Sequence, residues 1–270
     1  MKLPRAFLEI PLAHRGLHDV EKGIPENSRA AVRAAIEKGY GVEVDVQPSS
    51  CGEPMVFHDY ALGRLTGESG PVGMRSREEL GAIGLSGGDE GIPTLREILE
   101  IVDGRVPILI EMKDQDGGLG ENVGDLPRRV AETLGGYEGP VAVMSFNPHM
   151  IAEFARHAPD IPRGLVTMDF VDTDLWQLVP MDRREELSTI PDLERVGADF
   201  VSHGRMHLGR EDLGKVREKG LPILTWTVRS PEEEEEARKV ADNITFEGYL
   251  PVIPVMARLD AARPSSPTGG

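Results

Sequence analysis

The chain has 270 residues, of which 39% are hydrophobic and 28% are charged, as is typical of a globular protein with one large domain or two small ones. Its 46 acidic and 30 basic side chains give a net charge of −16. A surface of that charge repels the phosphates of nucleic acids and anionic membranes, so we expect neither as a partner.

The cysteine content and the N-terminal stretch bear on the compartment. Cys51 is the single cysteine, so an intrachain disulfide is excluded and nothing indicates an oxidising compartment. The first residues contain no apolar run of signal-peptide length, and no segment approaches the length of a transmembrane helix. The sequence therefore predicts a cytoplasmic protein without a transmembrane segment. It gives no indication of the oligomeric state.

Short apolar runs rich in Val and Ile alternate with helical patterns along the whole chain. The expected strands are Ile10–Ala13, Val42–Val46, Val106–Glu111, Val141–Ser145, Gly164–Thr167, Ala198–Ser202, Pro222–Thr227 and Asn243–Phe246. Most are followed by an expected helix, such as Asn27–Lys38, Asn147–His157 or Glu211–Lys219. Parallel strands need crossover helices, so the pattern predicts an α/β fold, a (β/α)₈ barrel. An open doubly wound sheet has the same alternation, and periodicity alone leaves both architectures open.

One long segment and the C-terminal end depart from this alternation. Asp59–Pro93 is rich in Gly and Ser, has one short helical pattern at Ser76–Leu80, and lies between the second and third expected strands. Loops of this length inside a compact domain are usually functional or disordered. We therefore expect one domain over residues 1–260, with residues 59–93 as a small insertion over the site. The composition of Ala261–Gly270 predicts a disordered tail.

The second expected strand carries carboxylates on one face. Side chains two residues apart on a strand point the same way, so in a barrel Glu43 and Asp45 would face the axis. The intervening valines would then pack against the helices. Buried carboxylates repel each other unless a cation or a proton compensates their charge. An edge strand with a solvated polar face is the alternative interpretation.

The third expected strand adds another carboxylate. Glu111 and Lys113 share a face near its carboxyl end, beside which Glu43 and Asp45 would lie. Three oxygen ligands without sulfur favour a hard divalent cation, Mg²⁺ or Ca²⁺. A simple ion pair between Glu111 and Lys113 is the alternative, and it would contribute little to stability.

Histidines follow two of the extended segments. His14-Arg15 ends the first strand, and His58-Asp59 ends a short extended run. Histidine can act as an acid or a base near neutral pH, whereas arginine and lysine can hold a phosphate. Each histidine taken alone is more often structural. His203, which follows the sixth strand, is an intermediate case. The other histidines lack such neighbours and are interpreted as surface or packing residues: His18, His149, His157 and His207.

The order of these residues resembles that of the glycerophosphodiester phosphodiesterase family. That family carries His-Arg, Glu-Asn, Glu-x-Asp and His-Asp in sequence, and the matching residues here are His14-Arg15, Glu26-Asn27, Glu43-Val44-Asp45 and His58-Asp59. Further similar stretches are Leu65-Thr66-Gly67, Ile92-Pro93-Thr94-Leu95, Glu111-Met112-Lys113, Ser145-Phe146 and Trp226-Thr227-Val228. The resemblance extends from about Leu12 to about Thr245, which is nearly the whole chain.

The resemblance implies a closed (β/α)₈ TIM barrel that hydrolyses glycerophosphodiesters to glycerol 3-phosphate and an alcohol in a metal-dependent reaction. It implies metal binding by Glu43, Asp45 and Glu111, and acid–base roles for His14 and His58. Substrate contacts would come from Arg15, Lys113 and Trp226. Glu26 and Asn27 would support the site, and Asn27 could also cap its helix.

The chain departs from the family's usual pattern at a few positions. Ser28 stands where threonine is frequent, Arg229 where asparagine is common, and Glu247 where aspartate is usual. These departures concern substrate preference more than the chemistry. A phospholipase D or sphingomyelinase D-like activity on a lysolipid is the alternative function, although the low aromatic content and the acidic charge disfavour it. The intact His14 and His58 argue against a barrel that binds phosphodiesters without turnover.

The nucleophile is the remaining question. No Ser, Cys or Thr adjoins a histidine of this set, so a covalent enzyme intermediate has no obvious donor. We hypothesise that the glycerol 2-hydroxyl of the substrate attacks phosphorus and forms a cyclic phosphate, since a tethered nucleophile has a large effective molarity. His14 would remove the hydroxyl proton and His58 would protonate the leaving alcohol. Attack by water is the alternative.

Overall fold

The computed structural model describes residues 3–171, 173 and 176–254, so the expected tail Ala261–Gly270 lies outside the described residues. Within these ranges, eight parallel strands form a closed barrel. They are β1 (Leu12–Ala13), β2 (Gly41–Pro48), β4 (Ile108–Met112), β5 (Val141–Ser145), β6 (Arg163–Thr167), β7 (Phe200–Gly204), β8 (Ile223–Val228) and β9 (Asn243–Phe246). The strand β1 pairs with both β9 and β2, which closes the sheet and confirms the (β/α)₈ TIM barrel.

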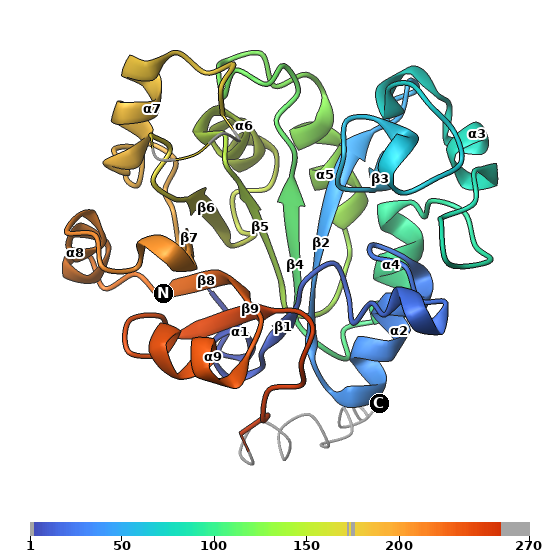
Figure 1. Ribbon diagram of the computed structural model, residues 1–270. Helices are drawn as coiled ribbons and strands as arrows, with labels where there is room; N and C mark the ends of the chain where they lie inside the picture. The colour runs from blue at the N-terminus through green and yellow to red at the C-terminus, as the bar shows by residue number, and fades with distance from the viewer. Residues whose placement is uncertain (1–2, 172, 174–175, 255–270) are drawn as a thin grey trace, which may run out of the picture.

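Helices surround the barrel and cover its outer face (Figure 1). They are α2 (Arg29–Lys38), α4 (Leu95–Val102), α5 (Leu126–Leu134), α6 (Pro148–His157), α7 (Met181–Ser188), α8 (Asp212–Glu218) and α9 (Pro231–Ala237). The valines of β2, Val42, Val44 and Val46, are fully buried in the cluster that also contains Val32 of α2 and Ile98 of α4. The alternate residues of β2 therefore face the barrel interior, as their period of two predicts.

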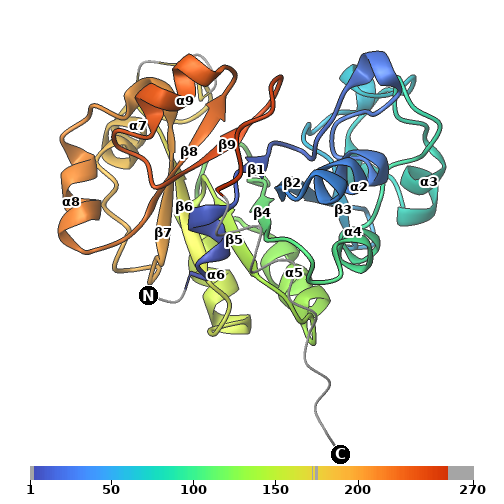
Figure 2. The same cartoon turned by 90° about the horizontal axis from the view of Figure 1, so that it is seen from below.

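A short N-terminal helix closes the lower end of the barrel, a feature that the sequence did not indicate. Figure 2, seen from below, shows α1 (Ala6–Glu9) lying among the strands. Phe7 of α1 packs with Leu12, Leu109 and Phe200 in the interior. The side-chain amide of Asn243 donates to the carbonyl oxygens of Phe7 at 2.8 Å and Ile10 at 2.7 Å. These bonds satisfy backbone acceptors at the closed end of the barrel.

The segment between the second and third barrel strands has a small core of its own. It begins with β3 (Pro54–Val56), antiparallel to β2, and continues through the short helices η2 (Leu62–Arg64), η3 (Val72–Met74) and α3 (Arg77–Ala82). Ser76 and Glu79 form a capping box at the start of α3. Its buried apolar residues are Met55, Phe57, Leu62, Val72, Leu80, Leu85 and Ile92. This apolar cluster holds the segment together beside the barrel.

The start of α2 differs from the expectation. The helix begins at Arg29, and the side chain of Ser28 caps it by accepting the N–H of Ala31 at 3.0 Å. Asn27 does not cap the helix. It lies in the left-handed region with φ 54°, and its side chain is bonded to Asp45 instead. Among the described residues, no helix is both long and apolar enough to cross a membrane.

Candidate active site

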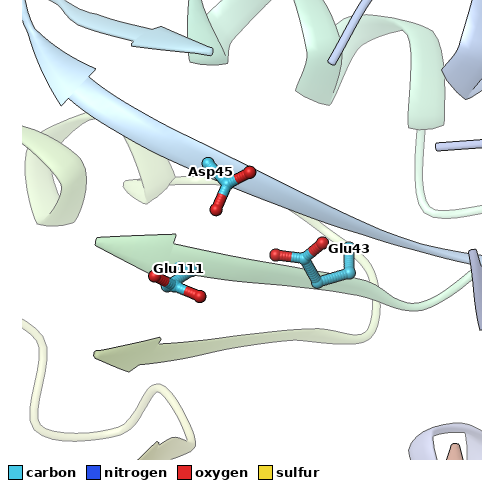
Figure 3. A group of neighbouring side chains, drawn as sticks. All are labelled: Glu43, Asp45 and Glu111. Carbon is cyan, nitrogen blue, oxygen red and sulfur yellow. The ribbon is translucent and has the colours of Figure 1, made fainter. Parts of the chain in front are cut away.

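Three carboxylates from two neighbouring strands converge inside the barrel (Figure 3). Glu43 and Asp45 project from β2, and Glu111 projects from β4 directly opposite Asp45 in the strand register. Each offers an oxygen within 4.8 Å of the others. Their exposed fractions are 1%, 1% and 7%, respectively. The three side chains thus converge as predicted. They are buried inside the barrel, and the alternative of an edge strand with a solvated polar face is not observed.

The charges of this cluster are only partly balanced. Burial, together with the charges of Asp45 and Glu111, raises the pKa of Glu43 well above its ordinary value. Burial also opposes the charge of Asp45, but Lys113, His58 and Arg15 overcome it and lower the pKa of that carboxyl. Within the part of the chain that the structure describes, one carboxylate of this buried cluster therefore has no cation to balance its negative charge. Such a group of buried oxygens suits a hard divalent ion, which prefers oxygen ligands.

Cations lie directly beside the cluster. The ammonium nitrogen of Lys113 is 2.8 Å from Asp45 Oδ1 and 2.5 Å from Glu111 Oε1. Burial lowers the pKa of Lys113, but the two carboxylates outweigh this effect and raise it, so the side chain stays charged. Arg15 Nε lies 3.4 Å from Asp45 Oδ2. Both cations line the same pocket as the carboxylates.

The loop after β1 braces Arg15 and the carboxylates. Arg15 has φ 55°, and its backbone N–H donates to Glu43 Oε2 at 3.0 Å. Its Nη1 donates to Glu26 Oε1 at 2.7 Å. The Asn27 amide donates to Asp45 Oδ2 at 2.9 Å, and the Asn27 N–H donates to the carbonyl oxygen of Arg15 at 2.8 Å. Glu26 and Asn27 therefore connect the loop to the carboxylates, Glu26 through Arg15 and Asn27 directly.

Both predicted histidines line the pocket, and each is bonded to a carboxylate through Nδ1. His14 Nδ1 is 2.6 Å from Glu247 Oε2, and His58 Nδ1 is 2.6 Å from Asp59 Oδ1. An arginine holds each carboxylate in turn. Arg229 Nε donates to Glu247 Oε1 at 2.7 Å, and Arg64 Nε donates to Asp59 Oδ2 at 2.7 Å. The site therefore contains two similar hydrogen-bonded series, in each of which an arginine holds a carboxylate and the carboxylate holds a histidine.

Glu247, Asp59 and Arg64 had no role predicted from the sequence. Glu247 was visible only as a departure from the family's usual aspartate, and its contact with His14 spans 233 positions of sequence. Arg64 belongs to the insertion and also donates to Glu26, at 2.9 Å from both Nη1 and Nη2. His18, interpreted from the sequence as a surface or packing residue, lies with its Nε2 3.7 Å from Glu247 Oε2.

Both active-site histidines are predominantly neutral at neutral pH in the free protein. Burial lowers the pKa of His14, and the hydrogen bond that His14 donates to Glu247 opposes that shift without cancelling it. Burial and the charge of Lys113 lower the pKa of His58 to about 4. The pKa of Asp59 is lowered to about 2: burial opposes ionisation, but hydrogen bonds from Arg64 and His58 outweigh it. A neutral imidazole has one donor and one acceptor nitrogen.

One wall of the pocket is apolar. The cavity has a volume of about 160 Å³, and Met144, Phe146 and Trp226 form the wall on the side of β5 and β8. The ring centroids of Phe146 and Trp226 are 5.5 Å apart, edge to face. The indole N–H of Trp226 donates to the carbonyl oxygen of Ser202 at 3.2 Å, which holds the ring in place. Trp226 thus presents aromatic surface to the pocket.

The chain is similar to known proteins over most of its length. Residues 14–244 match the sequence model of the glycerophosphoryl diester phosphodiesterase family. A glycerophosphodiester phosphodiesterase of Caldanaerobacter subterraneus subsp. tengcongensis is 32% identical over 240 residues, which are 84% of this chain and 89% of that protein.

Solved structures share the barrel. An Oleispira antarctica phosphodiesterase, solved in complex with the product sn-glycerol-3-phosphate, has a TM-score of 0.71 at 24% identity, with 90% of this chain and 94% of that chain covered. A glycerophosphodiester phosphodiesterase from Parabacteroides distasonis has a TM-score of 0.70 at 22% identity, with 94% and 96% covered. These structures agree with the closed barrel described above.

Proposed function

The chain belongs to the glycerophosphoryl diester phosphodiesterase family, and from this premise we propose that it hydrolyses glycerophosphodiesters to glycerol 3-phosphate and an alcohol with a divalent cation. One observation carries the proposal. A single pocket is lined by a buried cluster of three carboxylates, by Arg15 and Lys113, and by the histidines His14 and His58. These are the groups that phosphodiester cleavage needs: charge stabilisation, an acid and a base.

The cation would be held by Glu43, Asp45 and Glu111. Their oxygen-only donor set and their burial support Mg²⁺ or Ca²⁺ over a softer metal. When bound, such an ion supplies Lewis-acid polarisation of a phosphoryl oxygen. Asn27 supports this set, because its amide fixes the carboxylate of Asp45. Glu26 supports it less directly, by holding the guanidinium of Arg15.

Arg15 and Lys113 would bind the phosphate. Both line the pocket and both keep a positive charge beside the carboxylates. In a chain with a net charge of −16, these local cations offset the repulsion of an anionic substrate. Trp226 and Phe146 would contact the apolar part of the substrate, since they form the opposite wall.

The histidines would move the protons. In the first step, His14 removes the proton of the glycerol 2-hydroxyl, whose oxygen forms a bond to phosphorus while the bond to the alcohol breaks. The alcohol leaves with a proton from His58. Water then opens the cyclic phosphate with the two roles reversed, which returns both rings to their starting states. The anionic phosphodiester raises the pKa of a ring beside it, and so favours the protonated acid.

The size of the pocket supports a small substrate. Its volume of about 160 Å³ lies below the roughly 300–1,000 Å³ of pockets that enclose drug-sized ligands. A glycerophosphoryl group fits such a space better than the acyl chain of a lysolipid. This argument favours glycerophosphodiester hydrolysis over a phospholipase D or sphingomyelinase D-like reaction.

A single assay distinguishes these functions. The protein is incubated with glycerophosphocholine or with lysophosphatidylcholine, each with Mg²⁺ or Ca²⁺, and the products are identified by mass spectrometry. We expect glycerol 3-phosphate and choline from glycerophosphocholine, and much slower turnover of the lysolipid. Cleavage of the lysolipid alone would favour the lipase-like alternative. Binding of glycerophosphocholine without any product would indicate a non-catalytic barrel.

A further inference from the structure

Glu247 lies between an arginine and a histidine and is bonded to both. Its Oε2 is 2.6 Å from His14 Nδ1, and its Oε1 accepts the Nε–H of Arg229 at 2.7 Å. The hydrogen bond from His14, the proximity of His18 and the charge of Arg229 outweigh burial and lower the pKa of Glu247, so the carboxyl is ionised at neutral pH. An ionised carboxylate only accepts hydrogen bonds, so the proton shared with His14 belongs to Nδ1.

The backbone holds this arrangement in register. Arg229 follows the last residue of β8 and Glu247 follows the last residue of β9, two strands that pair in parallel. The N–H of Glu247 donates to the carbonyl oxygen of Val228 at 3.0 Å, and the N–H of Arg229 donates to Glu233 Oε2 at 2.7 Å. Both side chains therefore start from fixed backbone positions at the rim of the barrel.

The bond to Glu247 determines which nitrogen of His14 can react. Within residues 3–171, 173 and 176–254, no hydrogen bond engages Nε2 of His14, and the ring lines the pocket. With the proton on Nδ1, Nε2 has a lone pair and can accept a proton. With the proton on Nε2, the ring could not act as a base at that atom.

We propose that Arg229 and Glu247 are a positioning pair that fixes His14 in the tautomer protonated at Nδ1, with Nε2 as the proton acceptor. Glu247 sets the tautomer, and Arg229 sets the orientation of Glu247. The inference deepens the proposed function and rests on the role of His14 as the base. Arg229 also lines the pocket, but in this proposal it acts by positioning Glu247 and not by contacting the substrate.

The substitution Glu247→Gln tests the pair, because an amide has one accepting and one donating end. Arg229 only donates, so it selects the amide oxygen of the glutamine. The amide N–H then faces His14 and donates to Nδ1, which moves the ring proton to Nε2. We expect kcat to fall on the order of a hundredfold or more, as for a base held in its wrong tautomer, with little change in KM.

The second substitution, Arg229→Ala, separates positioning from other roles. Without the arginine the glutamine amide can turn, so its oxygen can accept from Nδ1 again. We therefore expect Arg229→Ala to raise the kcat of Glu247→Gln about tenfold or more, as the catalytic tautomer is restored. In the unsubstituted protein, Arg229→Ala should lower kcat only modestly. A residue with a merely structural role would not restore activity in this way.

Nitrogen-15 NMR gives a readout that does not depend on turnover. Long-range proton–nitrogen correlations show which ring nitrogen carries the proton, and comparison with His14→Gln identifies the His14 signals. At a pH where the ring is neutral, we expect Nδ1–H in the natural protein and Nε2–H in Glu247→Gln. Glu236→Gln is the control, since Glu236 is an exposed residue of α9 that pairs with Lys239 beyond the end of the helix. Circular dichroism and thermal melting check that each variant is folded.

The outcomes separate the two proposals. The positioning pair is overturned if Glu247→Gln keeps both the kcat and the tautomer of the natural protein. It is also overturned if Arg229→Ala lowers the activity of Glu247→Gln further, because Arg229 would then act on the substrate itself. Full turnover by His14→Ala would instead overturn the proposed role of His14, whichever tautomer the ring adopts.

Discussion

Asn27 and Asp45 are joined by hydrogen bonds in both directions, although they lie 18 positions apart in the sequence. The Asn27 amide donates to Asp45 Oδ2 at 2.9 Å, and the backbone N–H of Asp45 donates to Asn27 Oδ1 at 3.2 Å. Asn27 reaches this position with a positive φ of 54°. One side chain thus fixes both the carboxylate and the backbone of Asp45.

The first prediction concerns this contact. Asn27→Ala should lower the free energy of unfolding by about 2–3 kcal/mol, because a buried donor and acceptor are lost and alanine is strained at positive φ. Asn27→Gly removes the same hydrogen bonds without the strain, and should recover about 1 kcal/mol. Both variants should lose turnover to a similar extent. Denaturant melts and steady-state kinetics measure these quantities, and unchanged turnover in either variant would contradict the support role of Asn27.

The second prediction concerns the divalent cation. Mg²⁺ or Ca²⁺ should raise the melting temperature, since a ligand at a hundred times its Kd stabilises the folded state by about 2.7 kcal/mol. A chelator should abolish turnover, and Glu43→Gln should shrink the thermal shift. Glu236→Gln, on the surface of α9, is the matched control and should respond as the natural protein does. Undiminished turnover in excess chelator would rule out the metal requirement.

The third prediction concerns the two histidines. His14→Ala and His58→Ala should each lower kcat on the order of a hundredfold or more, the usual cost of losing a general acid or base. His149→Ala should change kcat little, because His149 lies on α6, outside the pocket lining of the described residues. Steady-state assays with glycerophosphocholine give the comparison. Near-normal rates in both active-site variants would show that other groups transfer the protons.

The fourth prediction concerns the nucleophile. If the glycerol 2-hydroxyl attacks phosphorus, a 2-deoxy analogue of glycerophosphocholine should react far more slowly than the natural diester, since the tethered nucleophile is gone. The analogue should still compete with the natural substrate, because its phosphate contacts are intact. Rates and inhibition constants measured side by side provide the test. Equal rates for the two substrates would favour direct attack by water.

The fifth prediction concerns the pH dependence of stability and a histidine outside the pocket. His203 is fully buried, its Nδ1 is 2.7 Å from Thr167 Oγ1, and its Nε2 is 3.2 Å from the carbonyl oxygen of His207. Burial lowers its pKa from 6.5 to about 4. Between these values the unfolded chain binds more protons than the folded protein, so stability falls as the pH falls through this window.

Below pH 4, the lowered pKa of His203 should have reduced the free energy of unfolding by about 3 kcal/mol relative to its value above pH 6.5. His203→Gln removes the titrating group, and should flatten the unfolding free energy between pH 6.5 and pH 4 relative to the natural protein. Urea melts across this range measure the slope, which does not depend on any uniform loss of stability in the variant. Parallel slopes in the two proteins would show that His203 does not titrate in this window.

The strands and the carboxylate cluster could be predicted from the sequence because both depend on local patterns. A period of two places Glu43 and Asp45 on one face of β2, and the adjacent parallel strand places Glu111 beside them. The first inference is local, and the second needs only the pairing of consecutive parallel strands, which the alternation of strands and helices implies. The valines between them identify the outer face by the same alternation.

Contacts that depend on the closure of the barrel could not be predicted. Glu247 meets His14 only because β9 pairs with β1, and the sequence does not specify that register. The helix cap shows a related limit. Asn27 and Ser28 are both good N-cap residues, and the tertiary bond from Asn27 to Asp45 decides between them. The helix α1 was missed because its four residues carry no periodic pattern of their own.

The division of the pocket into two walls has a consequence for how such a protein can diversify. Every residue proposed to touch the cation, the phosphate or a transferred proton lies between positions 14 and 113, whereas Met144, Phe146 and Trp226 come from the later strands. Recombination that exchanged the segment from β5 to β8 between related chains would alter which alcohol is accepted and leave the reactive groups intact. Under the proposed roles, substrate range and reaction chemistry would reside in separate portions of one polypeptide.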